Sequence, residues 1–220
     1  MNTRDTLDTQ LNVLENFDPI IPDSYQGSEY VMLGNLIPAI QTQVLDRMPT
    51  KPKFIRLDTM NLWMDVAMED LKKVIAKVDL LTINDEEARL LSGEYSLRKA
   101  AKLILKMGPK YLIIKKGEHG ALLFGEEGIF YAPALPLEEV FDPTGAGDTF
   151  AGGFIGYLAS TDDISFDNMK RAVVVGSAMA SFCVEKFGSE RIEDLSLEEI
   201  NSRVDEFKKL TDFNLDLTLA

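Results

Sequence analysis

Short apolar runs alternate with helical patterns along most of this chain, and this alternation restricts its fold more than any other feature. Short runs of Val, Ile, Leu and aromatic residues predict buried strands, whereas apolar residues spaced three and four apart predict helices. The predicted strands cover residues 30–33, 53–57, 80–83, 111–114, 121–124 and 129–132. The predicted helices cover residues 38–47, 68–78, 85–91, 97–107, 166–186 and 197–209, and one more runs from a glycine-rich segment to about 159.

Strands that alternate with helices build βαβ units, which place helices on both faces of a parallel sheet. The last two predicted strands are separated only by residues 125–128 and predict an antiparallel hairpin. We therefore expect an α/β fold with a mainly parallel sheet, in one domain that spans residues 1–220. Such sheets bind ligands at the carboxyl ends of their strands. Asp58, Asn84, Lys115 and the loop that begins at Asp142 each follow a predicted strand.

Composition and charge exclude several classes of protein. The chain is 45% hydrophobic and 27% charged, which are ordinary globular values, and no apolar run is long enough to span a membrane. The formal net charge of −13 argues against nucleic-acid and anionic-membrane partners, which require basic surface. A single histidine, His119, excludes histidine-based triads, and the single Cys183 is expected to be a small buried hydrophobe. We expect a cytoplasmic enzyme.

The segment from Asp142 to Phe154 reads DPTGAGDTFAGGF and begins a helical pattern. Gly145, Ala146 and Gly147 let backbone N–H groups approach a ligand closely, and a helix that starts there directs free N–H groups and its positive dipole end at an anion. Asp148 stands beside this anion site, where a carboxylate is suited to act as a base.

The alternative reading is a tight turn followed by a capped helix. That reading leaves Asp142, Thr144 and the later glycines of the segment without a role. The segment is not a Walker A loop, since no lysine follows the glycines, and the spacing G-x-G-x-x-G is absent from it.

This segment resembles the C-terminal signature of the ribokinase/PfkB carbohydrate kinase family. The resemblance implies a ribokinase-like three-layer fold and ATP-dependent phosphorylation of a hydroxyl on a sugar or sugar-like molecule. Carried over, Gly145, Ala146 and Gly147 line the anion hole, and Asp148 accepts the proton of the substrate hydroxyl. Asp142 and Thr144 match positions that hold a monovalent cation in many members. The implied cofactors are ATP and Mg²⁺, and K⁺ is left open.

Asn84 and Glu87 stand three residues apart at the start of a predicted helix. This spacing is that of a capping box, with Asn84 as the cap. It also resembles the family's N-x-x-E motif, which implies that Glu87 organises magnesium and that Asn84 contributes to the phosphate site. The two roles are compatible, since Mg²⁺ keeps much of its water shell and Glu87 would act mostly through metal-bound water.

Three further segments match the nucleotide-binding parts of the family. Lys115 and Gly117 stand in the strand and turn that border the nucleotide, and Lys115 is either a phosphate ligand or an outward-facing lysine. Ser181 and Gly188 lie in the helix and loop that border adenine, where small residues such as Gly176 equally suit close helix packing. Asp58 either lies near the transferred phosphate or belongs to the start of a following helix, with Asp58 or Thr59 as its N-cap.

The resemblance extends from about residue 27 onward, whereas family members carry further strands, a small β lid and a glycine-rich sugar-binding segment before this part. We therefore expect a domain truncated on its N-terminal side. The exposed sheet edge would favour self-association as a homo-oligomer. A non-catalytic nucleotide-binding module and a kinase for a nucleoside or a vitamin-like alcohol remain the alternatives.

Overall fold

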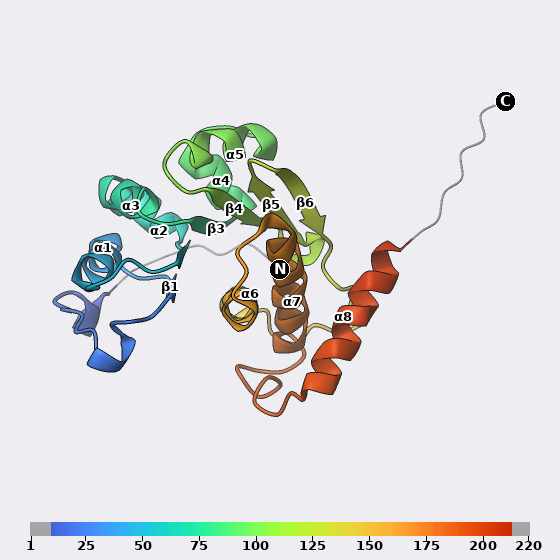
Figure 1. Cartoon of the computed structure of the whole chain (residues 1–220). Coiled ribbons are helices and arrows are strands. Elements are labelled where there is room, and N and C mark those ends of the chain that lie inside the picture. The colour runs from blue at the N-terminus through green and yellow to red at the C-terminus, as the bar shows by residue number, and fades with distance from the viewer. Residues whose placement is uncertain (1–9, 213–220) are drawn as a thin grey trace. The chain divides into compact units, whose positions relative to one another are not determined.

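Figure 1 shows the computed structural model of the chain, which describes residues 10–212. Contacts between residues divide the chain into two compact units. The first unit comprises residues 1–117 and 122–130, and the second comprises residues 118–121 and 131–220.

A six-stranded sheet, with strands ordered β1-β2-β3-β4-β5-β6, organises the first unit. Strands β1 to β4 are mutually parallel, and β5 and β6 follow them as a hairpin whose short connection requires antiparallel pairing. The mainly parallel α/β fold predicted from the alternating pattern is confirmed. All six predicted strands are present, and their ends differ from the prediction by single residues. The strands are β1 (Tyr30–Leu33), β2 (Phe54–Asp58), β3 (Leu80–Asn84), β4 (Tyr111–Lys115), β5 (Ala121–Gly125) and β6 (Gly128–Ala132).

Five α-helices belong to the described part of the first unit. The helix over residues 38–47 has the predicted ends, whereas the helix predicted for 68–78 ends at Ile75 because Asp79 bonds the β2 backbone and brings the chain into β3. The short helix α2 was not predicted. The helices are α1 (Pro38–Arg47), α2 (Asn61–Val66), α3 (Met68–Ile75), α4 (Asp85–Ser92) and α5 (Leu97–Leu105), with 3-10 turns η1 (Asn12–Leu14), η2 (Asp23–Tyr25) and η3 (Gly117–His119).

The hydrophobic core of the first unit lies on the central strands. Leu57, Leu81, Ile83 and Ile114 are completely buried, together with Ile104 of α5. Strands buried in this way read as continuous apolar runs rather than as alternating patterns, which is typical of parallel sheets. The core therefore holds the carboxyl ends of β2, β3 and β4, where the candidate polar residues stand, in a fixed register.

Three long helices form most of the second unit: α6 (Ala146–Thr161), α7 (Phe166–Cys183) and α8 (Leu197–Thr211). Helix α7 contacts both α6 and α8 (Figure 1). It ends at Cys183, three residues before the predicted end, because the chain turns at Val184. No helix within residues 10–212 is both long enough and apolar enough to cross a membrane.

Glycines set the close approach of α6 to α7. A Cβ atom at Gly176 would lie 2.7 Å from the carbonyl oxygen of Phe150, and one at Gly153 would lie 3.2 Å from the Cα atom of Gly176. Only glycine fits at both positions without a shift of the helices. The close packing suggested for Gly176 by the sequence is confirmed, and it fixes the helix that begins at the glycine-rich turn.

Candidate active site

The glycine-rich turn gives α6 an unusual start. Gly145 occupies the N-cap position with φ of 83°, a left-handed conformation that favours glycine, and no side chain caps the helix. The Thr149 N–H donates to the Gly145 carbonyl at 2.8 Å and closes the first helical turn. The absence of a side-chain cap leaves the backbone donors of this end available.

Backbone donors of this turn divide into one that is used and three that are free. The Ala146 N–H donates to the Pro143 carbonyl at 3.2 Å. Within residues 10–212, the N–H groups of Gly145, Gly147 and Asp148 have no protein acceptor. Free N–H groups at the positive end of a helix dipole are suited to bind an anion. Ala146 lies in the predicted anion hole, but its own N–H is already occupied.

Asp148 lies in the first turn of α6 and is exposed. Its carboxylate makes no hydrogen bond or ion pair with any of the described residues. An exposed carboxylate without a protein partner is free to accept a proton from a ligand.

Asp142 and Thr144 contact each other just before the turn. The Thr144 N–H donates to Asp142 Oδ1 at 2.9 Å. Hydrogen bonds from the Thr144 backbone and side chain lower the pKa of Asp142 below its ordinary value. Asp142 is therefore held as a carboxylate, beside the Thr144 oxygens that were predicted to share a monovalent cation.

The C-terminal end of α7 contacts the loop that contains Asp142 and Thr144. The N–H groups of Phe141 and Asp142 donate to the Val184 carbonyl at 2.8 Å and 3.4 Å. Cys183 is buried, as predicted, and its Sγ lies 3.7 Å from the Thr144 carbonyl oxygen and 3.9 Å from the Gly188 carbonyl oxygen. Gly188 has φ of 61°, so a left-handed turn brings it to the same place.

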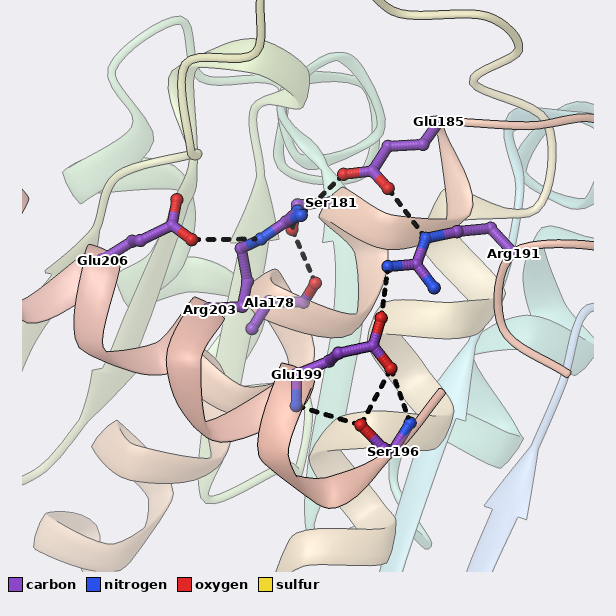
Figure 2. Close-up of polar contacts among 8 residues, drawn as sticks. All are labelled: Ala178, Ser181, Glu185, Arg191, Ser196, Glu199, Arg203 and Glu206. Atoms are coloured by element: carbon purple, nitrogen blue, oxygen red, sulfur yellow. Dashed lines mark hydrogen bonds and ion pairs between the residues drawn. The ribbon is translucent and has the colours of Figure 1, made fainter. Parts of the chain in front are cut away.

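Ser181 lies in a network of protein contacts rather than at an open surface (Figure 2). Its hydroxyl donates to the Ala178 carbonyl at 2.6 Å and accepts from Arg203 Nη1 at 2.8 Å. The side chain is buried. These contacts give Ser181 a structural role, and its predicted role in nucleotide binding stays a prediction.

Two arginines extend this network across α7, α8 and the loop between them. Glu185 accepts from Arg203 at 2.6 Å and from Arg191 at 3.0 Å (Figure 2). Both guanidinium groups lie over the ring of Phe182. Arg191 also bonds Glu199 at 2.9 Å. Hydrogen bonds from Ser196 and from Arg191 lower the pKa of Glu199 to about 2. Sequence reasoning missed this network, because its members are scattered from Ala178 to Glu206 (Figure 2).

A cavity of about 480 Å³ lies against the same network. Its lining consists of Glu139, Val140, Phe141 and Glu185. Val140 and Phe141 are large, exposed apolar residues that immediately precede the glycine-rich segment. No sequence motif predicted this cavity.

Asn84 and Glu87 of the first unit form the capping box that their spacing allows. The Glu87 N–H donates to Asn84 Oδ1 at 2.7 Å, and the Asn84 N–H donates to Glu87 Oε2 at 2.8 Å. Glu87 is buried, with 5% of its surface exposed. One carboxylate oxygen is thus engaged in capping, and the predicted role of Glu87 in magnesium binding stays a prediction. Among residues 10–212 no three acidic, histidine or cysteine side chains gather as a metal cluster.

Lys115 ends β4 beside Asn84, its partner in the register of β3 and β4. Its Nζ lies 3.2 Å from Asp58 Oδ2 at the end of β2. The alternative in which Asp58 or Thr59 caps the next helix is wrong, because Met60 occupies the N-cap of α2 and Asp58 instead pairs with the buried Arg56. The charge of Arg56 inside the apolar run at 54–57 was the feature of the sequence that could have indicated its ion pair with Asp58. Gly117 follows with φ of 56°.

Comparisons with known proteins identify a family whose sequences resemble this chain. The sequence profile of the pfkB family carbohydrate kinases matches residues 25–194. A cytidine kinase of Thermococcus kodakarensis is 33% identical over 141 residues, which are 61% of this chain and 49% of that protein. An ATP-dependent 6-phosphofructokinase of Thermoanaerobacterium thermosaccharolyticum is 33% identical over 144 residues, which are 64% of this chain and 42% of that protein.

A crystal structure of a ribokinase from Thermotoga maritima has a TM-score of 0.65 and 26% sequence identity. It covers 83% of this chain, which in turn covers 59% of that structure. The chain spans about half the length of the curated relatives that it matches.

Proposed function

Since the chain belongs to the pfkB family of carbohydrate kinases, we propose that it serves ATP-dependent transfer of a phosphoryl group to a hydroxyl of a sugar or sugar-like molecule. The observation that carries this proposal is the start of α6. There, three free N–H groups and a carboxylate without a partner lie within one helical turn. An anion site beside an available base is the combination that phosphoryl transfer to an alcohol requires.

In this proposal Asp148 orients the acceptor hydroxyl and takes its proton. The backbone of Gly145, Ala146 and Gly147 forms the anion hole, with the N–H groups of Gly145 and Gly147 as its free donors. Donors fixed by a helix need no rearrangement as charge develops on the transferred group. Loose transition states need little early proton removal, so an ionised carboxylate is adequate as the base.

The first unit contributes residues for the nucleotide and its metal. Asn84 and Lys115 contact phosphate oxygens, and Gly117 allows close approach of the backbone. Glu87 orients water around Mg²⁺, which when bound neutralises phosphate charge.

Asp142 and Thr144 hold a monovalent cation such as K⁺, and Ser181 and Gly188 border the nucleotide base. Self-association as a homo-oligomer and a cytoplasmic location also stay predictions.

The acceptor is the least determined part of the proposal. Relatives at 33% identity carry the names of kinases for a nucleoside and for a sugar phosphate. The cytidine kinase supports a nucleoside as the second candidate acceptor, because a nucleoside presents a ribose hydroxyl to the same base.

Turnover of ATP with ribose, fructose 6-phosphate and cytidine tests the function. We expect Asp148→Asn to lower turnover about 10²–10⁴-fold, the usual contribution of a general base, and to leave ATP affinity nearly unchanged. Asp167→Asn is the matched control, since Asp167 is also an exposed aspartate in the first turn of a helix. Turnover by Asp148→Asn within a few-fold of the unsubstituted protein would remove Asp148 from the mechanism. A chain that binds ATP but neither hydrolyses it nor phosphorylates any of the three acceptors would favour the non-catalytic module.

A further inference from the structure

Arg56 is an arginine whose side chain is completely buried in the middle of a parallel sheet. It lies in β2, and its side chain is 0% exposed. Removal of a guanidinium group from water is unfavourable unless charged and polar partners compensate it. Arg56 Nη2 donates to Asp58 Oδ2 at 3.0 Å, and Arg56 Nε donates to Thr82 Oγ1 at 3.1 Å. Arg56 and Asp58 stand two residues apart in the strand, so both side chains leave the same face of the sheet.

The Asp58 carboxylate is shared between two cations. Oδ2 accepts from Arg56 and from Lys115 Nζ, which lies at 3.2 Å, while Oδ1 accepts the Thr59 N–H at 3.0 Å. Lys115 lies two residues beyond Ile113, the partner of Thr82 in the register, so it stands on the same face. The contacts therefore run from the buried interior of β2 to the carboxyl edge of β4.

Exposure rises along this series of side chains. Arg56 is 0% exposed, Asp58 is 9% exposed and Lys115 is 23% exposed. Two cations share the Asp58 carboxylate, and Lys115 is the one nearer to solvent. Without Arg56, Asp58 would pair with Lys115 as the only one of these two cations.

We infer that Arg56 is a positioning residue that, through Asp58, keeps the Lys115 ammonium fixed and electrostatically available for the phosphates of a nucleotide. This inference rests on the proposed function. Stability gives little reason for the arrangement, because apolar residues commonly replace buried ion pairs at no loss of stability. A fixed ammonium also loses less conformational freedom when it binds an anion than a free lysine side chain does.

Binding of three probes to the full chain, measured by titration calorimetry, tests the inference. ATP and inorganic tripolyphosphate carry the phosphates, and adenosine lacks them. We expect Arg56→Met to weaken ATP and tripolyphosphate about tenfold, as for loss of one charge several ångströms from an anion near a protein surface. Adenosine affinity should stay unchanged. Arg98→Met is the control for net charge, since Arg98 is exposed on α5.

Four further variants make the test specific. Arg56→Gln keeps hydrogen-bonding groups without the charge and should show the same loss, whereas Arg56→Lys should stay within about threefold of the unsubstituted chain. If Arg56 acts through Lys115, the double variant Arg56→Met/Lys115→Met should bind ATP no more weakly than Lys115→Met alone.

Each other outcome counts against the inference. Unchanged ATP affinity in Arg56→Met and Arg56→Gln would overturn it, as would equal losses for ATP and adenosine, which indicate a structural role. Fully additive losses in the double variant would also overturn it. If the unsubstituted chain bound neither ATP nor tripolyphosphate, the inference and the proposed function would both fail. If the unsubstituted chain bound ATP and the Arg56 variants bound it equally tightly, the inference alone would fail.

Discussion

Replacement of Gly176 with alanine tests whether close packing of α7 holds the helix that carries the glycine-rich turn. The added Cβ atom would lie 2.7 Å from the Phe150 carbonyl oxygen and 3.1 Å from Cδ2 of the Phe150 ring. Carbon and carbonyl oxygen atoms normally approach to about 3.3–3.6 Å, so α6 and α7 must separate by more than half an ångström. The neighbour is helix backbone, which cannot move independently of α6.

A matched control gives the size of this effect. Gly156 lies in α6, and a Cβ atom there would meet nothing within 4 Å. In both variants alanine improves helix propensity by about 0.8–1 kcal/mol. Only Gly176→Ala also carries the cost of overpacking, about 1–3 kcal/mol. The difference in stability between the two variants therefore measures the packing cost alone.

Thermal unfolding is the assay. A domain of this size shifts its Tm by about 2–4 °C for each kcal/mol, so Gly156→Ala should raise the Tm by a few degrees. Gly176→Ala should melt about 2–12 °C below Gly156→Ala, from the packing cost estimated above. Phe150 follows Asp148 by two residues, so Gly176→Ala should also lower turnover in the folded fraction. Equal melting temperatures for the two variants would refute the packing argument.

Three further predictions concern the site and its support. Gly147→Val should reduce the transfer rate more than the Tm, because a β-branched side chain restricts the backbone beside the proposed anion hole. A lower Tm with normal specific activity would favour a turn without a role in catalysis. Glu87→Gln should raise the Mg²⁺ concentration needed for half-maximal rate, and an unchanged magnesium titration would leave Glu87 with capping alone. Glu199 has a folded-state pKa lowered to about 2, from an ordinary value of 4.5, so its ionic contribution to stability is present above pH 4.5 and lost as the pH falls toward 2. The stability difference between the unsubstituted chain and Glu199→Gln, measured by denaturant unfolding from pH 6 to pH 2.5, should therefore shrink below about pH 4.5, and a constant difference would contradict this.

Local signals in the sequence identified the features that depend on neighbours along the chain. The apolar runs predicted every strand to within single residues at its ends, because a strand buried on both faces must be apolar throughout. The capping box of Asn84 and Glu87 follows from a spacing of three residues, and Gly145 adopts the left-handed conformation that a tight turn requires.

Features that join distant segments were not predictable in the same way. The charge of Arg56 was visible inside an apolar run, but its partners Thr82 and Lys115 come from two other strands. Asp58 looked equally suited to cap a helix, and only the pairing of β2, β3 and β4 directs it to those cations.

The sequence by itself determined the α/β class, the extents of the strands and the residue types of the proposed anion site, because each depends on periodicity or on the conformational freedom of single residues. The tertiary structure decided which side chains meet. It showed that Ser181 accepts a hydrogen bond from Arg203 and that Gly176 lets the backbone of α6 pack closely against α7. It also showed that Asp58 pairs with both Arg56 and Lys115. The physical reason is that such contacts depend on the register of strands and the crossing of helices, which the periodicity of one segment does not specify.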